Sequence, residues 1–365
     1  MSIIKQLRSK VIRVNPFNRV STNGWKPYSR LMISGDGSDW SLDWDCRELE
    51  KISKQLGIWI VRPNYITITK DQSVFYTSRY NLLMSWVQPQ HRIGFPYYHG
   101  KPSSGKDFAR MISTIKTHHE KIARIQVSHS EMHDVILETG IDPHKVFRIP
   151  IGINLGYFDW TTQKIRAKTR KILDIPQSSV VIGSFQKDGI GWGKGLEPKL
   201  IKGPDIFMSA IKTLKDQVPE LYILLTGPAR GYVKEGLKKL GIPYTHKVLK
   251  NYSDIGLYYN ALDLYIVSSR EEGGPKAVLE SMASGIPLVT TRVGQAMDLV
   301  KHGENGWMVE PEDVEGLAYW IKYVIENHDS IHEVLKKGLE TANRNSYLAQ
   351  TSLWKNFMEG FVSFN

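Results

Sequence analysis

Two glutamates, Glu272 and Glu280, lie on either side of a short turn with seven residues between them. The apolar run 262–267 predicts a buried strand that ends just before the first of them. The glycine pair 273–274 allows a sharp turn with close backbone approach, and Pro275 suits the first position of a helix. A helix that begins directly after such a turn presents unpaired N–H groups and a positive dipole end. The stretch therefore predicts a seat for a phosphate group.

The two glutamates do not suit the phosphate itself, because like charges repel. Carboxylates accept hydrogen bonds from hydroxyl groups. A ligand with phosphate in its middle and hydroxyl-rich groups at both ends fits this pattern, and a nucleoside diphosphate sugar is such a ligand. The alternative is an ordinary strand–helix–strand unit whose acids are solvated.

The stretch 272–287, EGGPKAVLESMASGIP, resembles the E-x7-E signature of the retaining, family-4 type glycosyltransferases (glycosyl transferases group 1). Residues 259–263 before it and the pattern 303–313 after it extend the resemblance. The resemblance covers about 180–325 well and the earlier residues less well. It implies the GT-B fold, an α/β architecture with two Rossmann-like domains that face each other across a cleft.

The resemblance also implies roles for individual residues. Glu272 would bind hydroxyls of the donor sugar near the reacting carbon, and Glu280 would hold the ribose. A histidine at the end of a mid-domain strand lines the cleft in related enzymes, and His99 matches it; a structural histidine is the alternative. The catalytic residues so implied are Glu272, His99 and Lys202. The donor-binding residues are Lys187, Lys202, Gly227, Gly273, Gly274, Pro275, Lys276, Ala277 and Glu280.

The chain departs from the family pattern after the apolar run 180–183. Ser184 stands where the family has an arginine, and an unusual insertion, 187–198, precedes the family's Lys-Gly pair at 202–203. A leaving diphosphate needs cations to stabilise its developing charge. Lys187 is therefore a candidate for the missing positive charge, and a solvated loop lysine is the alternative.

Residues 30–34 are predicted to be the first strand of the N-terminal domain, and 35–44 the loop that follows it. We expect acceptor or cleft contacts in this loop from Gly35, Gly37, Trp40 and Trp44. The tryptophans could stack on a sugar ring, although a core position is at least as good an interpretation.

The same loop contains an Asp-x-Asp pattern, Asp43-Trp44-Asp45. Asp45 with Glu48 predicts a capping box for the helix that follows, so we interpret the pattern as capping and expect no metal site. Cations and helix amides would then do the electrostatic work of a metal, and no cofactor is implied.

The length of the chain and the resemblance predict two domains. The N-terminal, acceptor-side domain covers 1–174, with a basic linker at 159–175, and the C-terminal, nucleotide-sugar-binding domain covers 175–346. The amphipathic segment 347–365 is expected to pack back on the first domain.

The 365-residue chain has a net charge of +11, which indicates an anionic partner. No nucleic-acid motif stands out. The single cysteine excludes an internal disulfide and fits a reducing compartment. No secretory signal or membrane span is apparent. We therefore expect a cytoplasmic protein.

Residues 1–35 carry seven basic residues and no acid. Within them, 1–14 can form a helix that gathers Ile3, Ile4, Leu7, Val11 and Val14 on one face. Such a helix predicts peripheral binding to an anionic membrane surface at the inner face of the cell membrane, and a packed capping helix is an equal alternative.

The resemblance implies transfer of a sugar from a nucleoside diphosphate sugar to an acceptor hydroxyl with retention of the anomeric configuration, and we expect this transfer to need no metal. Family analogy suggests assembly of cell-surface polysaccharide or glycolipid, with a glycan or lipid-linked acceptor. One alternative is a nucleotide-sugar epimerase or a phosphorylase on the same fold. Another is a degenerate protein that binds nucleotide or membrane without catalysis.

Overall fold

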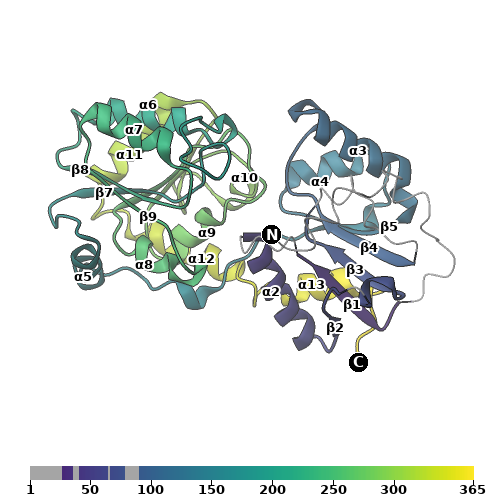
Figure 1. Ribbon diagram of the computed structural model, residues 1–365. Helices are drawn as coiled ribbons and strands as arrows, with labels where there is room; N and C mark the ends of the chain where they lie inside the picture. The colour runs from purple at the N-terminus through teal and green to yellow at the C-terminus, as the bar shows by residue number, and fades with distance from the viewer. Residues whose placement is uncertain (1–26, 36–40, 65, 79–89) are drawn as a thin grey trace. The chain divides into compact units, whose positions relative to one another are not determined.

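The structure, a computed structural model, describes residues 27–35, 41–64, 66–78 and 90–365. It divides into two compact units, Met1–Pro150 with Gln350–Asn365, and Ile151–Ala349 (Figure 1). The predicted N-terminal helix at 1–14 lies outside the described residues, as do Gly37 and Trp40. None of the described helices has the length and apolar character needed to cross a membrane.

The first unit contains a six-stranded parallel sheet in the order β2-β1-β3-β4-β5-β6. Every residue of β3 and β4 is buried, as expected for a parallel sheet covered on both faces. The strands are β1 Arg30–Ser34, β2 Trp59–Val61, β3 Gln72–Tyr76, β4 His91–Pro96, β5 Ile122–Val127 and β6 Val146–Arg148.

Among its described residues, the first unit has the α-helices α2 Ser41–Gln55, α3 Lys106–His118, α4 Ser130–Leu137 and α13 Thr351–Met358. The short 3-10 turns are η2 Thr67–Thr69, η4 Pro102–Ser104, η5 His119–Lys121 and η6 Pro143–Lys145. Because α2 already includes Ser41, the predicted capping box of Asp45 and Glu48 is wrong. Both residues lie inside the helix, and Trp44 is helical instead of lying in the preceding loop.

The last residues of the chain return to the first unit through α13. The Phe357 ring lies 5.6 Å from the Phe75 ring, and Trp354 lies 5.8 Å from it. The Arg124 guanidinium donates to the carbonyls of Phe357 at 3.0 Å and Glu359 at 2.7 Å. Aromatic packing and these hydrogen bonds place 350–365 in this unit.

The second unit contains another six-stranded parallel sheet, in the order β12-β11-β10-β7-β8-β9. Its strands are β7 Val180–Ser184, β8 Leu221–Thr226, β9 Tyr244–Lys247, β10 Leu264–Val267, β11 Leu288–Thr291 and β12 Trp307–Val309. The strands β10, β7 and β8 are neighbours, so the loops that leave their carboxyl ends meet at one edge of the sheet. This edge is where ligands bind in open α/β sheets.

Helices lie between these strands along the chain, and also before the first and after the last of them. They are α5 Gln163–Leu173, α6 Pro204–Leu214, α7 Gly231–Leu240, α8 Ile255–Tyr259, α9 Lys276–Ala283, α10 Ala296–Leu299, α11 Val314–Glu326 and α12 His332–Arg344. The 3-10 turns are η7 Leu155–Tyr157, η8 Leu200–Lys202 and η9 Tyr252–Asp254.

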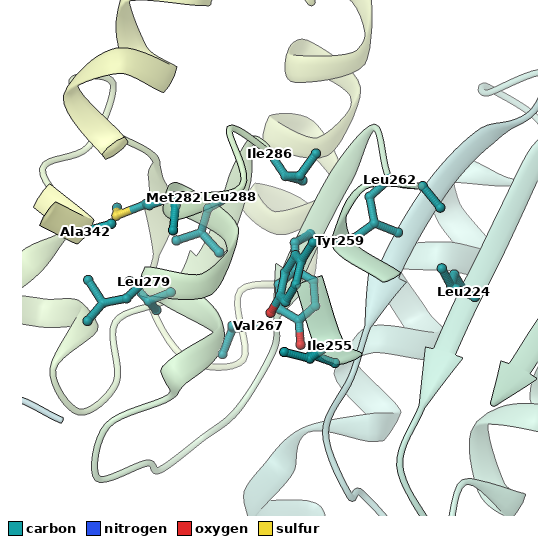
Figure 2. Packing of buried hydrophobic residues seen from close by; sticks show 14 of the residues in the cluster. Leu224, Ile255, Tyr259, Leu262, Val267, Leu279, Met282, Ile286, Leu288 and Ala342 are labelled. Atoms are coloured by element: carbon teal, nitrogen blue, oxygen red, sulfur yellow. The ribbon is translucent and has the colours of Figure 1, made fainter. Parts of the chain in front are cut away.

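Apolar side chains fill both faces of the second sheet, because neighbouring residues of each strand point to opposite sides. In β10, Leu264 and Ile266 pack in one core cluster, and Tyr265 and Val267 pack in the other. Figure 2 shows the latter cluster, in which Tyr259 lies among residues from α9, β10 and β11. The strand that leads into the Glu272 loop is thus fixed from both sides.

The division between the units falls at 150/151, whereas the sequence analysis placed it at 174/175. The predicted linker is instead mostly the helix α5, which packs in the second unit. Its Arg170 is buried, and the guanidinium donates to Asp263 Oδ2 at 2.6 Å and to the Ala261 carbonyl at 3.0 Å. The basic composition of 159–175 therefore reflects a docked helix.

Candidate functional site

The loop between β10 and α9 carries Glu272, and its backbone is held from two sides. The Thr291 hydroxyl donates to the Ser269 carbonyl at 2.6 Å, and the Gln295 N–H donates to the Gly273 carbonyl at 3.2 Å. Gly294 has a positive φ of 51°, and a Cβ there would lie 2.6 Å from the Glu272 carbonyl oxygen. Only glycine fits at this point, so the turn can pass close to the loop that follows β11.

An arginine fixes the same loop to the start of α6. Arg270 donates to both carboxylate oxygens of Asp205, at 2.8 and 2.7 Å, and to Glu312 at 2.8 Å. The paired hydrogen bonds hold the pKa of Asp205 below its ordinary value and raise that of Arg270. This bidentate geometry adds orientation as well as attraction.

Glu272 and Lys202 form an ion pair, with 2.5 Å between Lys202 Nζ and Glu272 Oε2. The side chains are 11% and 24% exposed, so the pair lies near the surface and is largely shielded. The Ser269 hydroxyl donates to the other oxygen, Glu272 Oε1, at 2.9 Å. Two residues predicted for catalysis are therefore in direct contact.

The position of Lys202 depends on the glycine that follows it. Gly203 has a φ of 61°, and a Cβ there would lie 1.8 Å from the carbonyl oxygen of Ser268. The Ser268 hydroxyl donates to the Gly203 carbonyl at 2.9 Å. The Lys-Gly pair thus has a physical reason: glycine lets η8 lie against the end of β10 and directs the lysine to Glu272.

The helix α9 begins at Lys276, directly after the glycine turn. Pro275 is its N-cap and supplies no side-chain hydrogen bond to the first turn. Gly274 lies close to Gln295, whose side-chain oxygen accepts from the Ile151 N–H at 2.8 Å. The first turn of α9 therefore lies where the sequence predicts the phosphate, next to the glycine turn.

Glu280 lies one turn further along α9 and is 5% exposed. Both carboxylate oxygens accept hydrogen bonds from tyrosines: Oε1 from Tyr252, and Oε2 from Tyr259 at 2.9 Å. Burial raises the pKa of Tyr259 well above its ordinary value, so this hydroxyl stays protonated and donates. The sequence analysis did not single out Tyr252.

A guanidinium group contacts the end of β7, although Ser184 stands there in place of the family's arginine. Arg230, from the start of α7, donates to the Ser184 carbonyl at 2.5 Å and to the Ser184 hydroxyl at 3.0 Å. Its charge is paired with Asp188, with 2.9 Å between Arg230 Nη2 and Asp188 Oδ2, and both side chains are buried. Burial raises the pKa of Asp188, an effect that Arg230 partly offsets. This buried arginine organises the site without being exposed to a ligand.

The insertion is folded onto α7 and does not extend freely. The carbonyls of Lys194 and Gly195 accept from the first N–H groups of α7, Gly231 and Tyr232, each at 2.8 Å. A Cβ on Gly195 would lie 2.2 Å from the carbonyl oxygen of Ala229. Together with the Asp188–Arg230 pair, these contacts fix both ends of the insertion.

Lys187 lies at the start of the insertion, with its Nζ 4.4 Å from the centroid of the Trp192 ring, a cation–π arrangement. Trp192 is 64% exposed. The preceding residue, Gln186, donates to the Lys202 carbonyl at 2.9 Å, and its side-chain oxygen accepts from Ser269. The backbone at Lys187 is therefore tied to the neighbourhood of the Glu272–Lys202 pair.

Gly227 follows β8 and has a φ of 83°, in the region that favours glycine. The His246 ring lies 2.7 Å from the Gly227 carbonyl oxygen. Gly227 thus ends its strand at the same edge of the sheet as Ser184 and the Glu272 loop.

The remaining predicted residues belong to the first unit. Gly35 follows β1, and a Cβ there would lie 2.5 Å from Asp43 Oδ1, so the glycine permits close approach of α2. Trp44 lies in α2 with the Arg47 guanidinium 4.6 Å from its ring. His99 follows β4 and lies 5.6 Å from the Phe108 ring. Their roles toward an acceptor or a transferred sugar stay predictions.

Residues 196–341 match the family described as glycosyl transferases group 1. The chain is 28% identical over 214 residues to D-inositol 3-phosphate glycosyltransferase of Corynebacterium urealyticum, covering 55% of this chain and 47% of that one. It is 25% identical to the lipopolysaccharide core biosynthesis mannosyltransferase LpsB of Rhizobium meliloti, over 50% of this chain and 60% of that one. The chain thus spans about half the length of these curated relatives.

The crystal structure of Anabaena Alr3699/HepE in complex with UDP-glucose superposes with a TM-score of 0.71. Sequence identity is 16%, and the match covers 90% of this chain and 99% of that one. At this identity the likeness shows the fold, and it spans both units. The chain therefore has the GT-B fold, and residues 196–341 of its second unit match the glycosyl transferases group 1 family.

Proposed function

We propose that the protein transfers a sugar from a nucleoside diphosphate sugar to an acceptor hydroxyl, with retention of the anomeric configuration. The observation that carries this proposal is the Glu272–Lys202 pair beside the start of α9. Within one group of loops it brings together a carboxylate that can accept hydrogen bonds from sugar hydroxyls, a lysine cation and the first turn of a helix. The Anabaena neighbour holds UDP-glucose in its crystal structure, which supports a donor of this class.

In the proposed reaction, the bond between the anomeric carbon and the diphosphate oxygen breaks as the acceptor oxygen bonds to the same face of that carbon. The acceptor proton passes to an oxygen of the leaving diphosphate. Lys202 and the first amides of α9 stabilise the charge that develops there, and Lys187 is the second candidate cation. The Glu272 carboxylate accepts hydrogen bonds from hydroxyls of the donor sugar. The proposed reaction requires no metal or cofactor.

The acceptor is proposed to be a glycan or a lipid-linked glycan of cell-surface polysaccharide or glycolipid assembly. The Rhizobium relative is named for lipopolysaccharide core biosynthesis, which supports this class of acceptor. The protein would act in the cytoplasm or at the inner face of the cell membrane. The basic residues of 1–35 would supply the attraction to an anionic surface.

The proposal is tested by thermal-shift screening of the purified chain against UDP, GDP, ADP and their common sugar conjugates. A ligand at a hundred times its dissociation constant stabilises the fold by about 2.7 kcal/mol, which a melting curve detects. We expect one nucleotide family to raise the melting temperature. A protein that no nucleotide stabilises would contradict the proposal.

Lys202→Ala is expected to slow transfer by about a hundredfold, because a preorganised charge at the leaving group is lost. Steady-state kinetics with the donor found in the screen measure this effect.

Lys187→Ala should slow transfer in the same assay, because Lys187 is the candidate for the missing arginine charge. Lys194→Ala, an exposed lysine of the same insertion, is the matched control and should keep its rate. An unchanged rate in Lys202→Ala would remove this lysine from the catalytic set.

A further inference from the structure

Tyr252 contacts two residues of α9, Lys276 and Glu280. Its hydroxyl donates to Glu280 Oε1, and its ring faces Lys276, whose Nζ lies 5.2 Å from the ring centroid. Lys276 and Glu280 are four residues apart and so share one face of the helix, about 5–6 Å from each other at Cβ. One side chain outside the helix thus touches both the residue at the predicted phosphate seat and the buried carboxylate.

The ring of Tyr252 contacts two other elements, α9 through Lys276 and η7 through Tyr157. Tyr157 of η7 makes an edge contact, with the ring centroids 6.2 Å apart. Lys276 Nζ donates to the Tyr347 hydroxyl at 3.0 Å and lies 5.6 Å from that ring as well. These contacts fix Tyr252 against α9, so its hydroxyl has a defined position relative to Glu280.

The two tyrosines on Glu280 differ in their access to a ligand. Tyr259 is fully buried, whereas Tyr252 is only half-buried. A carboxylate oxygen can accept more than one hydrogen bond, so its bonds to the tyrosines do not prevent Glu280 from accepting one from a ligand. A vicinal diol that approaches Glu280 meets the Tyr252 hydroxyl beside it.

We propose that Tyr252 is a specificity-determining residue that reads the ribose of the nucleotide together with Glu280. This inference rests on the proposed function, because it assigns the diol at Glu280 to a nucleotide donor. The Tyr252 hydroxyl orients the carboxylate, and its oxygen accepts from the ribose 2′-hydroxyl while Glu280 accepts from the 3′-hydroxyl. Discrimination between ribose and deoxyribose then depends on a residue outside the E-x7-E motif.

The test is calorimetric titration of the wild type and of Tyr252→Phe with UDP, GDP and ADP and with their 2′-deoxy counterparts. The variant keeps the ring and its contact with Lys276, and it removes only the hydroxyl. In the wild type, the nucleotide that binds should be favoured over its 2′-deoxy form by about tenfold or more, the cost of leaving the Tyr252 oxygen without this hydrogen bond. In Tyr252→Phe we expect this ratio to fall below about threefold.

Tyr258→Phe is the matched control, because Tyr258 is a half-buried tyrosine of the neighbouring α8 whose ring packs on Phe185. It should keep the wild-type ratio. If Tyr252→Phe keeps the wild-type ratio of affinities, the inference is wrong. This holds whether both affinities fall by the same factor, which would mean that Tyr252 only supports the fold, or both stay the same. If the wild type binds none of the nucleotides, the proposed function itself fails, a result distinct from a wild type that binds and a variant whose ratio does not change.

Discussion

Glu272→Gln is expected to lower turnover by about a thousandfold while leaving nucleoside diphosphate affinity within about threefold of the wild type. The carboxylate lies in the loop before α9, paired with Lys202 and Ser269. Contacts from this position to sugar hydroxyls can tighten as the anomeric carbon gains positive charge, and an amide cannot match them. Initial-rate kinetics and calorimetry on the same preparation measure the two quantities.

The control for this variant is Glu310→Gln. Glu310 also pairs with a basic residue, Arg292, but both residues lie in the exposed class, with side chains 68% and 46% exposed. An exposed pair contributes about 0–1 kcal/mol, so this variant should keep its activity. Turnover near that of the wild type in Glu272→Gln would remove the residue from the reaction.

Arg230→Met is expected to lower the free energy of unfolding by about 3–5 kcal/mol, because it leaves Asp188 buried without its charge partner. Arg230 also supplies hydrogen bonds to Ser184 and Thr226. Urea unfolding followed by circular dichroism measures the loss. The exposed Arg292→Ala should cost less than about 1 kcal/mol.

A second variant keeps this prediction testable if the first one fails to fold. Arg230→Met combined with Asp188→Leu removes both buried charges, and such replacements recover most of the stability or exceed it. We expect the double variant to be more stable than Arg230→Met. If the single variant loses less than about 1 kcal/mol, the buried pair does not anchor the insertion.

The fold of the second unit follows from local sequence signals. The apolar run before Glu272, the glycine pair and Pro275 indicate strand, turn and helix within a few residues of one another. The structure places β10 at Leu264–Val267 and α9 at Lys276–Ala283, in agreement with them. Such signals are strong because the periodicity, the turn and the cap all favour the same structure.

The start of α2 and the segment 159–175 were predicted wrongly for opposite reasons. At α2 the residues of the predicted capping box, Asp45 and Glu48, lie inside the helix. The sequence pattern of a helix start therefore occurs where no helix starts. In 159–175 the basic, polar composition is typical of a linker. The ion pair of Arg170 with Asp263, which docks this segment, joins residues 93 positions apart.

The residues that sequence reasoning missed, Arg230 and Tyr252, act through contacts distant in the chain. Arg230 meets Asp188 across 42 positions, and Tyr252 meets Glu280 across 28. Neither belongs to a motif with a fixed spacing. The loss of the family arginine at Ser184 was visible in the sequence, but the arrival of another guanidinium at that point required the structure.

The most direct measurement of the central claim is proton NMR of a nucleotide sugar incubated with the protein in the absence of acceptor. Slow hydrolysis needs no knowledge of the natural acceptor, since water takes its place. The account predicts release of the nucleoside diphosphate, with a free sugar that first appears in the anomeric configuration of the donor and no release in Glu272→Gln. Conversion to an epimer that still carries its nucleotide, or a released sugar of inverted configuration, would contradict it.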